Sequence, residues 1–151
     1  MSSSTLRIPP PLYYLMAILA MILLHLFAPL GRWLHYPWRL IGIVFILSGF
    51  SLSVGSAMYF RKLGTKTTPG TKPTLVVTTG PFRFTRNPMY LGLLTILVGI
   101  SILLGTISPL IVIPVIFLVF HTFVSREEKW MEEWFGDYYL SYKKKTRRWL
   151  L

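Results

Sequence analysis

The stretch MYLGLLTILVGISILLGTISPLIVIPVIFLVFHTFV, residues 89–124, contains no Asp, Glu, Lys or Arg. A helix needs about 20 mostly apolar residues to cross the hydrocarbon core of a bilayer, so this stretch is long enough for two crossings. Gly105, Ser108 and Pro109 lie near its middle and favour a tight turn there. The sequence therefore predicts a helical hairpin in a membrane, with spans at about 89–106 and 109–124.

Two further apolar runs precede this hairpin, at about 12–30 and 40–60. We expect the first run to be a retained helix, because it is long, follows three prolines and lacks a clear small-residue cleavage site. Of the 151 residues, 53% are hydrophobic and only 14% are charged, whereas a soluble domain has about 25% charged residues. We predict an all-α, polytopic integral membrane protein in which residues 1–151 form one membrane-embedded domain with about four transmembrane helices.

The basic residues are distributed unequally between the two sides of such a bundle. With four spans, both termini and the segment 61–88 share one side, which carries 14 of the 16 Lys and Arg residues. By the positive-inside bias, segments 61–88 and 125–151 are predicted to face the cytoplasm. The net charge of +11 is attributed to this topology and to contact with anionic lipids, so no nucleic-acid partner is expected.

The cysteine and histidine content of the chain excludes some kinds of active site. The chain has no cysteine, so it has neither a thiolate nucleophile nor a cysteine-ligated metal. Its three histidines form no pair at metal-ligand spacing, and no metal site is predicted.

Residues 61–79 are rich in Gly, Thr, Pro and Lys, which predicts irregular backbone. Near a bilayer such backbone is tolerated where it is buried in protein or lines a polar cavity, so we expect this segment to form a pocket wall.

The segment GPFRFTRNPMYLG, residues 80–92, leads into the hairpin. Pro88 fits the first turn of a helix, where its missing N–H is not needed. The free N–H groups of a helix N-terminus attract anionic groups and acceptor atoms. Arg86 and Tyr90, four residues apart, are expected on one face. The alternative interpretation is an aromatic and cationic belt at the membrane interface.

The segment REEKWMEEWFGDYYLSYKKKTRRW, residues 126–149, follows the hairpin. Ser125 and Glu128 have the spacing of a capping box, which predicts that a new helix begins here. Aromatic residues recur every fourth position, which predicts an amphipathic helix lying on the membrane, and Gly136 allows a bend. Glu127 is a functional candidate because it is ionisable and lies at the membrane boundary. The basic tail, residues 143–148, is predicted to bind anionic headgroups and to have no catalytic role.

Together the two segments resemble the isoprenylcysteine carboxyl methyltransferase and phospholipid methyltransferase superfamily, over roughly residues 67–149. Members of this family are polytopic helical enzymes that hold S-adenosylmethionine at the cytoplasmic face. The resemblance implies this cofactor and a lipidic or amphiphilic methyl acceptor. The family's cofactor contacts correspond to Val76, Val77, Phe82, Asn87, Pro88, Tyr90 and Glu127. Arg86, His121 and Glu128 are our candidate catalytic residues.

Two departures from the family pattern bear on the substrate. The isoprenylcysteine enzymes usually have His where this chain has Asn87, which cannot titrate and therefore cannot transfer a proton. Phe123 stands in place of an arginine linked to recognition of a substrate carboxylate, which argues against a prenylated cysteine. Phospholipid N-methylation is the alternative acceptor chemistry. Two other classes stay open: a sterol-type reductase that binds NADPH, and a non-catalytic module anchored to lipid by its charged segments.

Overall fold

The computed structural model describes residues 9–65 and 71–150, so Arg7 and Lys66, two of the bases counted above, lie outside it. The described chain is all-helical, as predicted. Its long helices are α1 (Pro10–Phe27), α2 (Ile41–Lys62), α3 (Pro88–Leu104) and α4 (Val112–Lys145). Three short 3-10 helices connect them: η1 (Trp38–Leu40), η2 (Gly80–Arg83) and η3 (Ser108–Ile111). By length and composition α1, α2 and α4 can each cross a membrane, and α3 is a shorter apolar helix of 17 residues.

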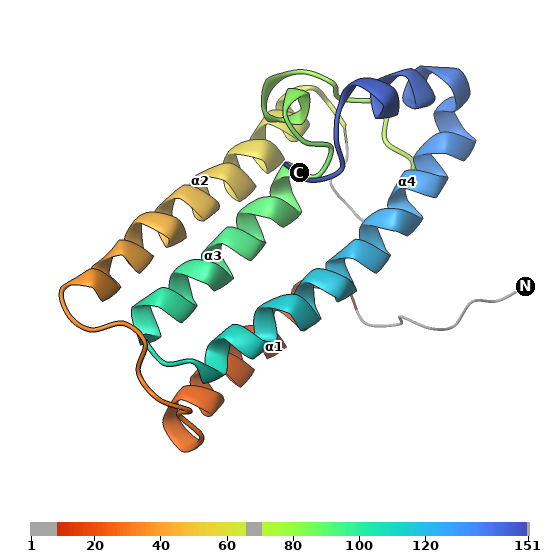
Figure 1. Cartoon of the computed structure of the whole chain (residues 1–151). Coiled ribbons are helices and arrows are strands. Elements are labelled where there is room, and N and C mark those ends of the chain that lie inside the picture. The colour runs from red at the N-terminus through yellow and green to blue at the C-terminus, as the bar shows by residue number, and fades with distance from the viewer. Residues whose placement is uncertain (1–8, 66–70, 151) are drawn as a thin grey trace, which may run out of the picture.

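The helices run alternately up and down the bundle (Figure 1). The α2–α3 connection and the C-terminal segment therefore meet at one end, and the α1–α2 and α3–α4 connections meet at the other. At this second end His25 Nδ1 lies 2.8 Å from the Thr106 hydroxyl, and Arg39 Nε donates to the Leu103 carbonyl at 2.7 Å. Arg39 thus satisfies a carbonyl at the C-terminus of α3, where cations are favoured.

The predicted turn between the third and fourth spans is confirmed. Helix α3 ends at Leu104, and Gly105 follows in the left-handed region with φ of 71°, where a side chain would be strained. The Gly105 N–H bonds the Ser101 carbonyl, which closes the last turn of α3. Ser108 and Pro109 then begin η3, which leads directly into α4.

Helix α2 packs mainly against α3, through glycines spaced seven residues apart on both helices. Gly42 faces Gly99, and Gly49 faces Gly92, in the antiparallel register. A Cβ atom placed on Gly49 would lie 2.6 Å from the Gly92 carbonyl oxygen. The absence of side chains thus lets the two backbones touch, which is how helices associate in lipid, where no hydrophobic force drives them together.

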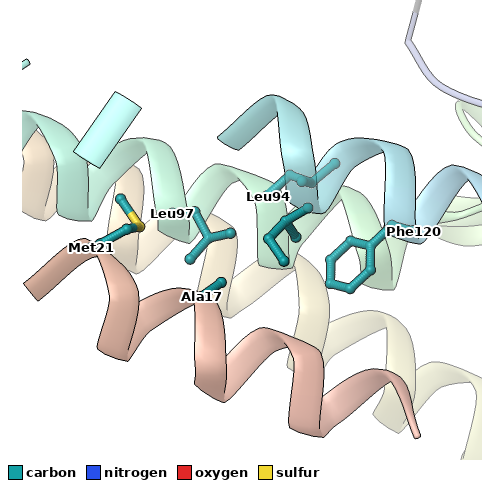
Figure 2. Close-up of a cluster of buried hydrophobic side chains, with 6 residues drawn as sticks. Ala17, Met21, Leu94, Leu97 and Phe120 are labelled. Carbon is teal, nitrogen blue, oxygen red and sulfur yellow. The ribbon is translucent and has the colours of Figure 1, made fainter. Parts of the chain in front are cut away.

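Helices α1, α3 and α4 enclose the apolar core (Figure 2). Its buried members come in pairs from the three helices: Ala17 and Met21, Leu94 and Leu97, Ile116 and Phe120. By contrast, large apolar side chains on the outer faces are more than 60% exposed, among them Leu26, Val44 and Leu118. So much outward apolar surface fits a lipid environment.

The predicted restart of a helix at Ser125 is wrong. Helix α4 continues unbroken through this position, because the Ser125 hydroxyl donates to the His121 carbonyl one turn earlier, at 2.7 Å, and does not cap an N-terminus. The interfacial segment is therefore the second half of α4. The bend predicted at Gly136 is present, with φ of 51° and ψ of −129°. In the part of α4 after this bend, Tyr142 is buried whereas Tyr138 is 62% exposed.

Candidate functional site

A cavity of about 370 Å³ lies at the end of the bundle where the α2–α3 connection meets the second half of α4. This volume falls in the usual range for small-molecule pockets. Its walls come from the beginnings of α1 and α3, from α2, from the α2–α3 connection and from α4. The described part of the connection thus forms a pocket wall, as its composition predicted. Val76 and Val77, which belong to no helix or strand, are part of that wall.

Eight of the ten residues selected from the sequence line this cavity. They are Val76, Val77, Phe82, Arg86, Asn87, Tyr90, Glu127 and Glu128. The other two, Pro88 and His121, are not among the lining residues. Pro88 begins α3 as predicted. His121 faces the C-terminal segment, where its Nε2 lies 3.0 Å from Arg148 Nη1 and its Nδ1 accepts a long bond from Trp149 Nε1 at 3.4 Å.

One part of the cavity wall is apolar and held rigidly. Val76, Val77 and Phe82 are buried, and the Phe82 ring lies 5.5 Å from the Phe60 ring of α2. The Tyr142 hydroxyl donates to the Phe82 carbonyl at 2.6 Å. Tyr142 lies beyond the apolar part of α4, and burial raises the pKa of its hydroxyl. The hydroxyl therefore stays protonated and keeps donating this hydrogen bond. The bond ties η2 to the segment after Gly136.

Glu127 brings a carboxylate to the cavity. Its Oε1 accepts a hydrogen bond from the Tyr90 hydroxyl at 3.1 Å, and the Tyr90 ring packs against Phe120 at 5.1 Å between centroids. The ring contact with the core of the bundle thereby fixes the position of Tyr90, and the hydrogen bond from Tyr90 fixes the position of the Glu127 carboxylate. Among the described residues, no donor bonds the second carboxylate oxygen of Glu127, which leaves it available to a ligand.

Glu128 lies between two guanidinium groups. Arg86 Nε donates to Oε1 at 3.0 Å, whereas Arg148 donates to Oε2 from Nε at 3.1 Å and from Nη2 at 2.8 Å. The Glu128 and Arg86 side chains are only 4% and 8% exposed. A buried carboxylate is stable only when it is paired and its oxygens are hydrogen-bonded, and here both oxygens are. The capping role that we expected for Glu128 is therefore wrong.

The C-terminal segment is bound to the protein more extensively than the sequence indicated. Arg86 Nη1 donates to the carbonyls of Lys143 and Thr146, and Arg148 Nη1 donates to the Ser125 hydroxyl at 3.0 Å. Arg148, which belongs to the basic tail predicted to bind lipid headgroups, bonds Glu128 and Ser125 within the protein. Sequence reasoning missed Arg148 because no local pattern indicates its partners, which are 20 to 27 residues away.

Several other lining residues were also missed. Pro10 and Pro11 come from the start of α1, and Ser53 and Phe60 from α2, far in sequence from both motifs. Trp130 and Trp134, by contrast, belong to the aromatic pattern noted in the sequence, and their rings stack at 6.2 Å. Within residues 9–65 and 71–150 no group of three or more His, Asp or Glu side chains could hold a metal ion.

The described lining combines an apolar wall, the N-terminus of α3 and a Glu127 carboxylate oxygen that no described residue bonds. Such a lining suits a ligand that is partly aromatic and partly charged, and it suits reactions in which the ligand supplies the reactive group.

The sequence of this chain resembles those of known proteins over parts of its length. A sequence model of the phospholipid methyltransferase family matches residues 38–138. The chain is 43% identical over 63 residues to an uncharacterized protein of Haemophilus influenzae, an alignment that covers 41% of this chain and all of that protein. It is 35% identical over 76 residues to the protein-S-isoprenylcysteine O-methyltransferase of Schizosaccharomyces pombe, covering 50% of this chain but only 32% of the yeast enzyme. No solved structure matches the chain.

Proposed function

Since the chain belongs to the phospholipid methyltransferase family, we propose that it transfers a methyl group from S-adenosylmethionine to a lipidic or amphiphilic acceptor. The observation that carries the proposal is that both motif segments line one cavity of about 370 Å³. We place this cavity at the cytoplasmic face, because its end of the bundle carries most of the basic residues.

The lining residues match the chemical groups of S-adenosylmethionine. The apolar wall of Val76, Val77 and Phe82 suits the adenine ring. The carboxylate of Glu127 suits the ammonium group or the ribose hydroxyls. Burial raises the pKa of Glu127 to about 7, and a positively charged ammonium group beside it favours the ionised form, which accepts strong charge-assisted bonds. Asn87, at the N-terminus of α3, and the free N–H groups beside it suit the methionine carboxylate.

The protein's own task in this reaction is to position the reactants and exclude water. When bound, S-adenosylmethionine supplies a methyl group on a positively charged sulfur, and the charge disperses as the methyl group leaves. Orientation of the acceptor and exclusion of water then provide most of the acceleration. Met131, Trp134 and Tyr139 cover the cavity with apolar surface. Asn87 can orient a reactant by hydrogen bonds but takes no proton.

The charges of the lining favour an acceptor that carries no carboxylate. Arg86 is the only Lys or Arg among the described lining residues, and it is already bonded to Glu128. Phe123, which replaces the family arginine, packs against the Tyr13 ring at 5.9 Å. A neutral amine on an amphiphilic molecule needs no cation for binding and no base for attack. We therefore favour N-methylation.

Carboxyl methylation of a prenylated cysteine is the second candidate, supported by 35% identity to the yeast enzyme of that name. Offering both acceptor classes to the purified protein in detergent, with labelled S-adenosylmethionine, separates the two chemistries.

Thermal unfolding with and without ligand tests the cofactor assignment. S-Adenosylhomocysteine at 100 times its dissociation constant adds about 2.7 kcal/mol of stability, which is readily measured as a shift in Tm. We expect this shift with S-adenosylhomocysteine and none with NADPH at the same concentration. A shift with NADPH alone would support a reductase, and a shift with neither would support a non-catalytic module.

A further inference from the structure

The segment that follows α4 folds back and crosses the beginning of α3. Helix α4 ends at Lys145, and Thr146 is extended with ψ of 132°. The Arg147 carbonyl then accepts a bond from the Arg86 N–H at 2.9 Å. The Arg148 carbonyl accepts bonds from the Thr85 hydroxyl at 2.8 Å and from Asn87 Nδ2 at 3.3 Å. Residues 146–149, which we call the C-terminal strap, thus fix the residues just before α3.

Arg148 anchors the strap to α4. All three nitrogens of its guanidinium group are engaged: Nε and Nη2 bond Glu128, and Nη1 bonds the Ser125 hydroxyl and contacts His121 Nε2. The side chain is 25% exposed, so these partners enclose most of it. The strap also lies beyond residues 38–138, the part of the chain that matches the family.

We propose that Arg148 is a positioning residue for the cofactor cavity, acting through Glu128 and the strap on Arg86 and Asn87. Arg148 does not line the cavity, whereas Glu128, Arg86 and Asn87 do. The strap holds Arg86 by the backbone and Asn87 by the side chain, and Glu128 holds the Arg86 guanidinium. This inference rests on the proposed function, because the cavity is taken to bind S-adenosylmethionine.

The effect of losing Arg148 follows from this geometry. Glu128 would keep one guanidinium partner, and the strap carbonyls would lose their anchor. Arg86 and Asn87 would then shift against the cavity wall. Displacement of Asn87 would cost the ligand about one hydrogen bond. We therefore expect Arg148→Gln to weaken S-adenosylhomocysteine binding by about 3- to 10-fold.

Arg147 provides a matched control. It is adjacent, carries the same charge and has an exposed side chain. The experiment measures S-adenosylhomocysteine affinity by calorimetry, and backbone hydrogen exchange over residues 85–87, in the full-length protein in detergent. For Arg147→Gln we expect affinity within about two-fold of wild type and unchanged exchange, as for an exposed charge. For Arg148→Gln we expect both weaker binding and faster exchange.

Each outcome decides the proposal. If the two variants bind alike, or if Arg148→Gln speeds exchange without loss of affinity, Arg148 has no positioning role. If wild-type protein does not bind S-adenosylhomocysteine, the proposed function fails, and hydrogen exchange alone then decides whether Arg148 anchors the strap. Should Arg148→Gln not fold, Arg148→Lys retains the charge opposite Glu128 but loses the planar set of donors. It should bind several-fold more weakly than wild type, and equal binding would overturn the inference.

Discussion

Replacing Glu128 by glutamine tests the energetic importance of the buried ion pairs at the cavity. In the wild-type protein both carboxylate oxygens accept bonds from guanidinium groups, at distances of 2.8 to 3.1 Å. Glutamine keeps one acceptor oxygen but turns an NH₂ group toward the other guanidinium. One of the two arginines thus loses its partner, and the site gains uncompensated positive charge.

The loss of stability expected for Glu128→Gln depends on how deeply the ion pair is buried. Removing one member of a buried ion pair costs about 3 to 5 kcal/mol, whereas breaking an exposed pair costs about 0 to 1 kcal/mol. Glu128 is 4% exposed and Arg86 is 8% exposed, so the larger value applies to their pair. Since each kcal/mol changes Tm by about 2 to 4 °C in a chain of this size, we expect Glu128→Gln to lower Tm by roughly 6 to 20 °C.

Glu132→Gln is the control. Glu132 pairs with Lys143 on the same helix, but both side chains are about one-third exposed. Thermal unfolding of both variants in the same detergent, followed by circular dichroism, should show a large loss of stability for Glu128→Gln and a change of at most about 2 to 4 °C for Glu132→Gln. Equal effects of the two substitutions would refute the assignment of a buried, structurally essential network.

Three other results are expected. Glu127→Gln should lose a charge-assisted bond to the ligand and weaken S-adenosylhomocysteine binding by about 10- to 150-fold in calorimetry, and unchanged affinity would remove Glu127 from the site. Gly49→Leu should prevent α2 from packing against α3 and reduce the yield of folded protein in size-exclusion chromatography. Gly55→Ala, whose added Cβ atom points into open space, should leave the yield unchanged, and equal yields of the two variants would contradict the close contact. In intact cells, a cysteine at Lys145 should be protected from an impermeant reagent while one at Tyr36 is labelled, and the reverse pattern would invert the topology.

The sequence predicted the helices well, because their signals are local. The uncharged run 89–124 and the Gly105 turn within it defined α3 and the first half of α4. The glycine contact between α2 and α3 was missed, although the seven-residue spacing of Gly42 and Gly49, and of Gly92 and Gly99, was a readable signal. Small residues at this spacing on two neighbouring apolar runs indicate close helix packing.

The site was predicted only in part, because its electrostatics depends on pairings distant in sequence. The two motifs supplied most of the lining residues, since each motif is a short segment that the fold brings to one end of the bundle. The roles of Glu128 and Arg148 could not be read locally. Ser125 followed by Glu128 matches a capping box, but the same serine can bond a carbonyl one turn back in a continuous helix. Only the tertiary structure distinguishes these two possibilities.

The most direct test of the account is transfer of an isotopically labelled methyl group. Purified protein in lipid nanodiscs would be incubated with S-adenosylmethionine carrying a deuterated methyl group and with amine-bearing or prenylcysteine-bearing amphiphiles, and the lipid fraction analysed by mass spectrometry. We expect a labelled methyl group on an amphiphilic product with wild-type protein, and much less label with Glu127→Gln. Binding of S-adenosylhomocysteine without any labelled product from either acceptor class would contradict methyl transfer to an amphiphile of these kinds.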